Sequence, residues 1–196
     1  RPYNKKQLTY FSMKGEAIAS QCEHADNLAP AIYGGFVLVK SIHPLEIIQL
    51  PTPDDLYVTV IHPQIEIKTA EARAILPKQV DLELAVKQWA NVGSFVHALH
   101  TQDVKLFAAS LQDYIVEPFR SKLIPGFDEV KQTALKQGAL GSGISGSGPS
   151  IFSFCKGNIA FDLINCIKFL YRLNHPIVQL FRCHHRVLSF GLNVLS

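Results

Sequence analysis

Hydrophobic positions recur with two different periods along the chain, and their interleaving predicts a mixed fold. Apolar residues at helical spacing predict helices in KKQLTYFSMKGEAIASQ, over residues 5–20, and in IEIKTAEARAILP, LELAVKQWANVGSFVHALH, VKLFAASLQDYI and PGFDEVKQTALKQG. Alternating or β-branched stretches predict strands in AIYGGFVLVKS, LYVTVIHP and PSIFSF. Because strands and helices alternate throughout, the class is α+β or α/β.

A break in this pattern at PTPDD predicts a boundary between two domains. Two prolines and two acids lie there between strand-like stretches. We therefore expect a first domain over residues 1–50 and a second over residues 51–196. After residue 157 the chain keeps helix-like apolar spacing but becomes rich in Cys, His and Phe.

Composition excludes several classes of partner. The 196 residues carry a formal net charge of only +3 with scattered Lys and Arg, so the sequence predicts no nucleic-acid binding. No apolar run reaches the ~18 residues of a membrane helix, which predicts no membrane partner. The four cysteines are far apart, and neither they nor the histidines show a metal-ligand spacing, so we expect reduced thiols, a cytoplasmic location and no metal held by these residues.

The stretch GALGSGISGSGPS, residues 138–150, allows several interpretations. It contains G-x-G-x-x-G, but a dinucleotide site needs a strand before the glycines and a helix after them, and here the order is reversed. No Lys-Ser or Lys-Thr pair closes it as a Walker A loop. A flexible linker is disfavoured because the run joins a helix to an apolar strand within few residues. A structural turn and an anion-binding loop both remain open.

Three short stretches carry candidate binding groups, each with a structural alternative. HADNLAP sets His24, Asp26 and Asn27 before a strand, either as a turn with a helix cap or as a cluster for a polar substrate. In KTAEARAILP, Thr69 and Arg73 lie one helical turn apart and could hold a carboxylate or phosphate, or form an N-cap and a surface ion pair. Arg120 follows a proline in EPFR and suits bidentate carboxylate binding, although alone it is equally a surface arginine.

Together, HADNLAPAIYGGF, KTAEARAILP, EPFRSKLIPGF and GALGSGISGSGPSIF resemble the homoserine kinase branch of the GHMP small-molecule kinases, over about residues 5–157. The glycine stretch is similar to the third motif of that superfamily, and the other three motifs narrow the resemblance to this branch. The resemblance implies an α+β fold, in which the end of a GHMP N-terminal domain precedes a ferredoxin-like C-terminal domain.

The resemblance also implies a reaction and roles for particular residues. Such a cytoplasmic kinase transfers the γ-phosphate of ATP, with Mg²⁺, to the hydroxyl of L-homoserine on the route to threonine. The implied substrate-binding residues are His24, Asp26, Asn27, Arg73 and Arg120, with Thr69 and Arg73 at the reacting groups. The implied glycine-loop residues are Gly141, Gly143, Ser145, Gly146, Ser147 and Gly148.

Two departures from the family pattern lead to further expectations. No stretch resembles the P-x-x-x-G-L-G-S-S loop that holds ATP or the carboxylate that serves Mg²⁺, so we expect a fragment whose nucleotide-binding motifs lie in a missing N-terminal segment. The tail after Gly157 is expected to be divergent or frame-shifted. The alternatives are a catalytically incompetent fragment, a small-molecule-binding module, or another GHMP kinase acting on mevalonate or a sugar. A homodimer is left open.

Overall fold

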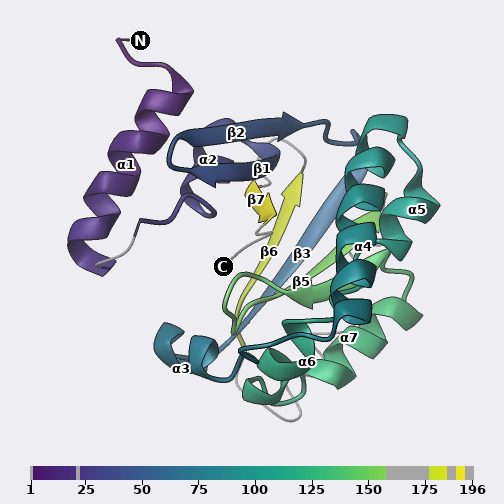
Figure 1. Cartoon of the computed structure of the whole chain (residues 1–196). Helices are drawn as coiled ribbons and strands as arrows, with labels where there is room; N and C mark the ends of the chain where they lie inside the picture. The colour runs from purple at the N-terminus through teal and green to yellow at the C-terminus, as the bar shows by residue number, and fades with distance from the viewer. Residues whose placement is uncertain (1, 21–22, 158–176, 185–188, 193–196) are drawn as a thin grey trace. The chain divides into compact units, whose positions relative to one another are not determined.

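The protein divides into two compact units. The structure, a computed structural model, describes residues 2–20, 23–157, 177–184 and 189–192 (Figure 1). The first unit comprises Arg1–Asp54 with His184–Ser196, and the second comprises Asp55–Cys183. The break between them falls within the PTPDD stretch. That the N-terminal and C-terminal domains of the family meet between residues 50 and 51 stays a prediction.

The first unit is built from two helices and a small sheet. Helix α1 spans Lys5–Ser20, as predicted, and α2 spans Leu28–Tyr33. Strands β1 (Gly35–Ile42) and β2 (Leu45–Leu50) pair antiparallel, and β7 (Ser189–Leu192) pairs parallel with β1, which gives the order β2-β1-β7. The core of this unit contains the buried residues Met13, Ala25 and Leu45.

The second unit is built on a four-stranded sheet of order β4-β5-β3-β6. Its strands are β3 (Leu56–Pro63), β4 (Gly141–Ile144), β5 (Ile151–Lys156) and β6 (Ile177–His184). Strand β5 pairs antiparallel with both β3 and β4. Strand β3 carries buried residues on both faces, since the adjacent Val58 and Thr59 are both buried. Its Ile61 belongs to a core that also includes Ile124, Phe127, Val130, Ala134 and Ile151.

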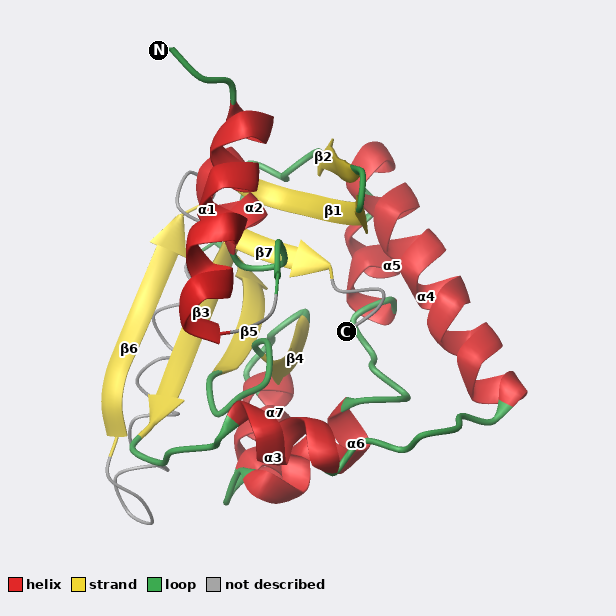
Figure 2. Cartoon of the chain, turned by 60° about the vertical axis from the view of Figure 1, so that its left-hand side comes forward, coloured by secondary structure: helices red, strands yellow, loops and turns green. Residues whose placement is uncertain are grey.

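The helices that the structure describes in the second unit belong to the segments between β3 and β4 (Figure 2). They are α3 (Thr69–Ala74), α4 (Leu82–Thr101), α5 (Val104–Ala109), α6 (Glu117–Arg120), a 3₁₀ turn (Ser121–Leu123) and α7 (Phe127–Lys136). The α+β class is therefore confirmed.

Several sequence predictions differ from the structure. IEIKTAEARAILP and VKLFAASLQDYI, each predicted as one helix, are helical only over α3 and α5. AIY, predicted to begin a strand, ends helix α2, and the strand starts only at Gly35. The first part of the glycine stretch, predicted as a loop, is strand β4, because its backbone pairs with β5 from Gly141 to Ile144. The described parts of the tail are strands β6 and β7 in place of helix, since both pair with sheet neighbours.

Candidate active site

Arg120 joins three of the predicted motifs through its guanidinium group. The side chain ends α6 and is only 8% exposed. Its Nε donates a hydrogen bond to the carbonyl oxygen of Ala72 in α3 (3.2 Å), and its Nη1 donates to that of Gly146 in the glycine stretch (3.0 Å). The alternative of an ordinary surface arginine is therefore wrong, because the buried guanidinium holds TAEAR, EPFR and the glycine stretch together.

The short helix that carries Arg120 is fixed by a carboxylate that precedes it. Asp113 accepts hydrogen bonds from the backbone N–H groups of Ile115 (2.8 Å), Val116 (2.9 Å) and Glu117 (3.2 Å). The N–H groups of Val116 and Glu117, at the cap position and the first residue of α6, are donors that the start of a helix leaves without an intrahelical acceptor. Pro118 in the first turn adds a fixed φ and removes one such donor.

Glu117, at the start of α6, forms a buried ion pair with Lys131 of α7. The two side chains are 10% and 12% exposed, and the Lys131 Nζ donates to Oε1 of Glu117. Burial raises the pKa of the Glu117 carboxyl, and Lys131 acts in the opposite direction. The pair therefore ties α6 to the helix that precedes β4.

The first two glycines of the G-x-G pattern are required by close packing. A Cβ on Gly141 would come within 2.3 Å of Leu111 Cδ1, and a Cβ on Gly143 would come within 2.9 Å of Glu117 Oε2 and 3.2 Å of Phe152 Cζ. The segment from Leu111 to α6 therefore lies directly against β4. For these two glycines the structural explanation holds.

The second half of the glycine stretch is a tight hairpin with an open side. The N–H of Ser145 donates to the carbonyl of Ser150 (2.8 Å), and that of Gly148 donates back to Ser145 (3.1 Å). Gly146 has a φ of +60°, and the space beside its Cα is open for at least 4 Å. The hydroxyl of Ser150 is hydrogen-bonded to Nδ1 of His62 in β3 (2.8 Å). The specific path that argued against a linker is confirmed.

A second guanidinium lies near that of Arg120. Arg73 follows Ala72, whose carbonyl Arg120 contacts, and its side chain is exposed. Burial lowers the pKa of Arg120; Asp113 counteracts this effect, and the like charge of Arg73 adds to it. Two arginines close enough to repel are a favourable site for an anion, because a bound carboxylate or phosphate offsets the repulsion.

Thr69 is the first residue of α3, and the preceding Lys68 occupies the cap position without a side-chain capping bond. The interpretation of Thr69 as a plain N-cap is therefore wrong. Its side chain lies outside the described part of the structure. The backbone puts Thr69 and Arg73 one turn apart on the same helix, as predicted.

The residues predicted from HADN lie in the other unit of the chain. His24 and Asp26 are half-buried, while Asn27 is exposed and occupies the position before α2 without a side-chain capping bond. The helix-cap alternative therefore fails for the Asn27 side chain. Whether these three residues share a pocket with Arg73 and Arg120 stays a prediction.

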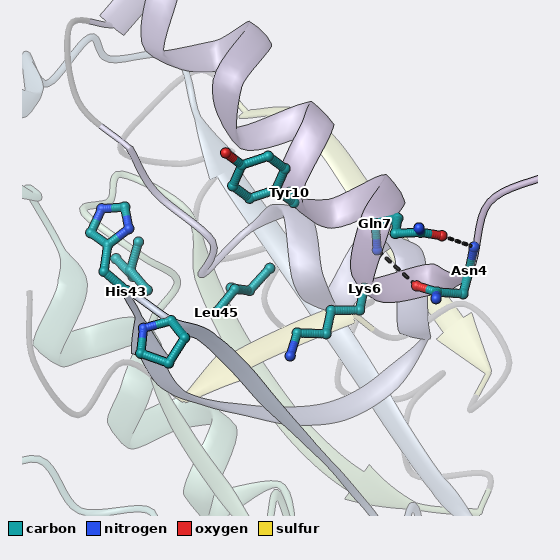
Figure 3. Close-up of a pocket in the computed structure, with 8 residues that line it drawn as sticks. Asn4, Lys6, Gln7, Tyr10, His43 and Leu45 are labelled. Atoms are coloured by element: carbon teal, nitrogen blue, oxygen red, sulfur yellow. Dashed lines mark hydrogen bonds between the residues drawn. The ribbon is translucent and has the colours of Figure 1, made fainter.

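A surface hollow in the first unit involves none of the predicted residues. It lies between the start of α1 and the β1–β2 turn, where Tyr10, His43 and Leu45 line it (Figure 3). Asn4 and Gln7 at its rim exchange reciprocal hydrogen bonds between side chain and backbone, both 2.9 Å long, and thereby cap α1. These two polar side chains are therefore occupied with the helix terminus.

Neither a metal-ligand cluster nor a membrane-spanning helix occurs in the described part of the chain. No group of three or more His, Cys, Asp or Glu side chains there could hold a metal ion. No helix there is both long and apolar enough to cross a membrane.

Comparison with known proteins agrees with the motifs gathered at this site. Residues 95–172 match the family model "GHMP kinases C terminal". This match extends beyond Gly157, the residue after which the resemblance was predicted to fade. The chain is thus similar to the GHMP kinases. Curated proteins that resemble it include homoserine kinases.

The homoserine kinase of Chlorobium phaeobacteroides (strain BS1) is 51% identical over 154 residues, which are 79% of this chain and 48% of that protein. That of Methanococcus maripaludis (strain C5) is 40% identical over 84% of this chain and 54% of its own length. The chain thus spans about half the length of these relatives. A crystal structure of homoserine kinase from Cytophaga hutchinsonii has a TM-score of 0.90 and 46% identity, over 96% of this chain and 60% of that one. The L. major mevalonate kinase, at 16% identity over 92% of this chain and 58% of that one and a TM-score of 0.65, shares the fold alone.

The sequence motifs predicted the arginines and glycines of the site, but they did not predict the residues that fix these in position. Asp113, Lys131 and His62 were assigned no role from the sequence, and Glu117 was quoted within EPFR without one. Lys131, His62 and Glu117 act through partners in other segments, so local spacing gives no signal for them. Asp113 acts locally, on the N–H groups of residues 115–117, and a polar residue shortly before a helix is a feature that the sequence could have revealed.

Proposed function

We propose that Arg73 and Arg120 bind the carboxylate of L-homoserine, and that this site serves the ATP-dependent phosphorylation of its hydroxyl to O-phospho-L-homoserine. The observation that supports the proposal best is the buried Arg120 guanidinium, which contacts both Ala72 and Gly146. An arginine held at both edges of its planar group is pre-oriented, so binding costs little side-chain entropy.

Electrostatics favours an anionic group at this position. Two of the five N–H donors of Arg120 are directed at backbone carbonyls, and the others remain for a ligand or a neighbour. Because Arg73 and Arg120 repel one another, a carboxylate between them gains from both charges. The open side of Gly146 leaves room for a substrate beside Arg120.

The other predicted residues take roles that rest on the resemblance. Thr69 would lie close to the reacting hydroxyl, and Asn27, with His24 and Asp26, would contact the polar groups of the substrate. Within the glycine hairpin, the N–H groups of Ser145 and Gly148 already donate internally, so a nest for phosphate would use Gly146 and Ser147.

ATP is the phosphate donor that a kinase family implies, and Mg²⁺ its usual companion. The described residues include no carboxylate cluster suited to Mg²⁺. We therefore assign no residue as a magnesium ligand and derive no step through the metal. What these residues supply is orientation of the substrate and positive charge near the transferring group.

A second candidate function is binding of L-homoserine without catalysis by the 196-residue chain. It is favoured by the residues of the site themselves, because Arg120, held between Ala72 and Gly146, offers a pre-oriented cation to a carboxylate. Both candidates require the arginine pair, and they differ in whether ADP is released.

Isothermal titration of the 196-residue chain with L-homoserine, followed by an ADP-release assay with Mg-ATP, separates the candidates. Kinase function predicts L-homoserine binding and ADP release that depends on L-homoserine and not on mevalonate. Binding without ADP release identifies the binding function. Absence of L-homoserine binding with and without Mg-ATP refutes both.

Arg73→Ala is the sharpest variant, because Arg73 is exposed and its loss should leave the fold intact. We expect L-homoserine to bind about 10–100-fold more weakly, the effect of one charge-assisted hydrogen bond. Lys122→Ala is the matched control: it also removes an exposed cation, from the 3₁₀ turn that follows Arg120. An unchanged affinity in Arg73→Ala would remove Arg73 from the site.

A further inference from the structure

The glycine hairpin, residues 145–150, is hydrogen-bonded to side chains from two other segments. Arg120 of α6 donates to the carbonyl of Gly146, and His62 of β3 is bonded through Nδ1 to the hydroxyl of Ser150 (2.8 Å). Glycine allows many backbone conformations, and two residues of this hairpin are glycines with positive φ. A single conformation of the hairpin therefore depends on contacts such as these.

His62 ends a face of β3 that is otherwise apolar. Side chains two residues apart in a strand share a face, and the other members of this face are Leu56, Val58 and Val60. The β3–β5 ladder ends with Ile61 paired to Ile151, which puts Ser150 directly opposite His62. Directly opposed side chains are close enough to bond across two strands, and both of these are half-buried. The polar residue at the end of β3 is therefore matched to a polar residue of the hairpin.

Hydrogen bonds within the hairpin connect Ser150 to the carbonyl that Arg120 contacts. The carbonyl of Ser150 accepts from the N–H of Ser145 (2.8 Å), and Gly146 is the next residue along the chain. Nη1 of Arg120 donates to the carbonyl of Gly146 at 3.0 Å. A displacement of Ser150 would therefore move the acceptor that orients one edge of the guanidinium group.

We propose that His62 is a positioning residue for the anion site, because its bond to Ser150 keeps the Gly146 carbonyl within reach of Arg120. A hydroxyl both donates and accepts, so Ser150 bonds to either tautomer of a neutral imidazole. The anchoring of the hairpin and of Arg120 stands on these hydrogen bonds. Its effect on L-homoserine rests in addition on the proposed function.

A purely structural role for His62 predicts a different result. If the bond served only the stability of the sheet, its loss would increase the opening of the whole β4–β5 ladder alike. If the bond positions the hairpin, its loss increases the opening of residues 145–150, because segments of a protein open locally with their own free energies. The loss of one hydrogen bond between neutral groups changes such a local equilibrium about 3–10-fold.

Amide hydrogen exchange of the 196-residue chain, resolved by NMR, measures this opening without a ligand. His62→Phe keeps an aromatic ring and removes both ring nitrogens. We expect the N–H groups of Ser145 and Gly148 and the Nε–H of Arg120 to exchange about 3–10-fold faster in the variant. The N–H of Leu140, which is bonded to β5 just before β4 begins, should exchange as in the wild type. Unchanged exchange in the hairpin or at Arg120, or equal acceleration at Leu140, would overturn the proposal.

Further variants separate the hydrogen bond from the ring that makes it. Ser150→Ala removes the same bond from the other side, so it should reproduce the faster exchange and add nothing when combined with His62→Phe. His62→Asn puts an amide close to the position of Nδ1 and should restore slow exchange, whereas His62→Gln puts it close to Nε2 and should not. His100→Phe is the matched control at an exposed histidine of α4, and it should leave the exchange unchanged. Rescue by His62→Gln alone, or wild-type exchange in Ser150→Ala, would refute the assignment.

Calorimetry with L-homoserine tests the consequence for the substrate. We expect His62→Phe to bind L-homoserine about 3–10-fold more weakly than the wild type, and His62→Asn to bind it as the wild type does. A wild-type chain that does not bind L-homoserine refutes the proposed function, while the exchange data still decide whether His62 anchors Arg120. Equal affinities of the wild type and His62→Phe, with faster exchange in the variant, would show that Arg120 binds without this anchor and would overturn the positioning role.

Discussion

The ion pair between Glu117 and Lys131 offers a direct test of how α6 is held beside the glycine strand. Lys131→Met removes the ammonium group and keeps an apolar stem of similar length. Because both side chains are about nine-tenths buried, the Glu117 carboxylate is left without a partner where water cannot replace it. Breaking a buried pair from one side costs about 3–5 kcal/mol, and we expect about 3 kcal/mol in the free energy of unfolding.

The loss should depend on pH, with a sign that follows from the pKa of Glu117. Burial raises the pKa of this carboxyl above its ordinary value of 4.5, and Lys131 is the main group that opposes the rise. A carboxyl whose pKa is higher in the folded state stabilises the fold most below pH 4.5, and this contribution is lost as the pH rises through the raised pKa. Without Lys131 the pKa rises further, so the variant should be destabilised more at pH 8 than at pH 5.

Thermal unfolding of dilute protein, followed by circular dichroism at both pH values, measures the effect. A loss of 3 kcal/mol corresponds to a fall of about 6–12 °C in the melting temperature. Lys87→Met is the matched control, since it breaks the exposed pair with Glu83 and should cost about 0.5 kcal/mol or less. Glu117→Gln combined with Lys131→Met should recover part of the loss. A Lys131→Met variant that is equally stable at pH 5 and pH 8, relative to wild type, would refute the reasoning.

Three further predictions concern the neighbours of this pair. Gly141→Ala should lower the free energy of unfolding by about 1–3 kcal/mol, because its Cβ would meet Leu111 at 2.3 Å, and chemical denaturation measures it. Asp113→Ala should cost about 1–2 kcal/mol by the same measurement, since three N–H groups at the start of α6 lose their acceptor, and Asp113→Asn should recover part of this. Arg120→Lys should weaken L-homoserine binding about tenfold in calorimetry, because lysine cannot span Ala72 and Gly146.

The parts of the fold that the sequence predicted are those in which local pattern and tertiary burial agree. Helix α1 and strand β3 follow their helical and alternating periods to within a residue of the prediction. Helix α6 was not predicted, because four residues are too few to show a helical period of apolar positions. The Asp113 side chain accepts hydrogen bonds from the N–H groups that lead into this helix. Strand β4 escaped because glycine and serine have low β-propensity, and pairing with β5 overrides that preference.

The sequence allowed the residues of the candidate site to be predicted, but not the residues that position them through tertiary contacts. Arg73, Arg120 and Thr69 could be selected because arginine and threonine on short spacings suit an anionic substrate, and the resemblance to a known family gave them roles. Lys131 could not be selected, because its pairing with Glu117 depends on how α7 packs against α6, 14 residues away along the chain. Contacts of this kind are set by tertiary packing.

The glycine stretch combines two physical requirements that look alike in sequence. Gly141 and Gly143 are two residues apart in a strand, so they share one face, and that face lies against Leu111 and Glu117. Ser142, between them, points to the other face, where its hydroxyl donates to the carbonyl of Phe152 (2.8 Å). The spacing G-x-G is therefore the period of a strand that a neighbouring segment approaches closely. Gly146 meets a different need, since its positive φ turns the hairpin and its carbonyl receives Arg120, which makes it the glycine of this stretch that the substrate proposal requires.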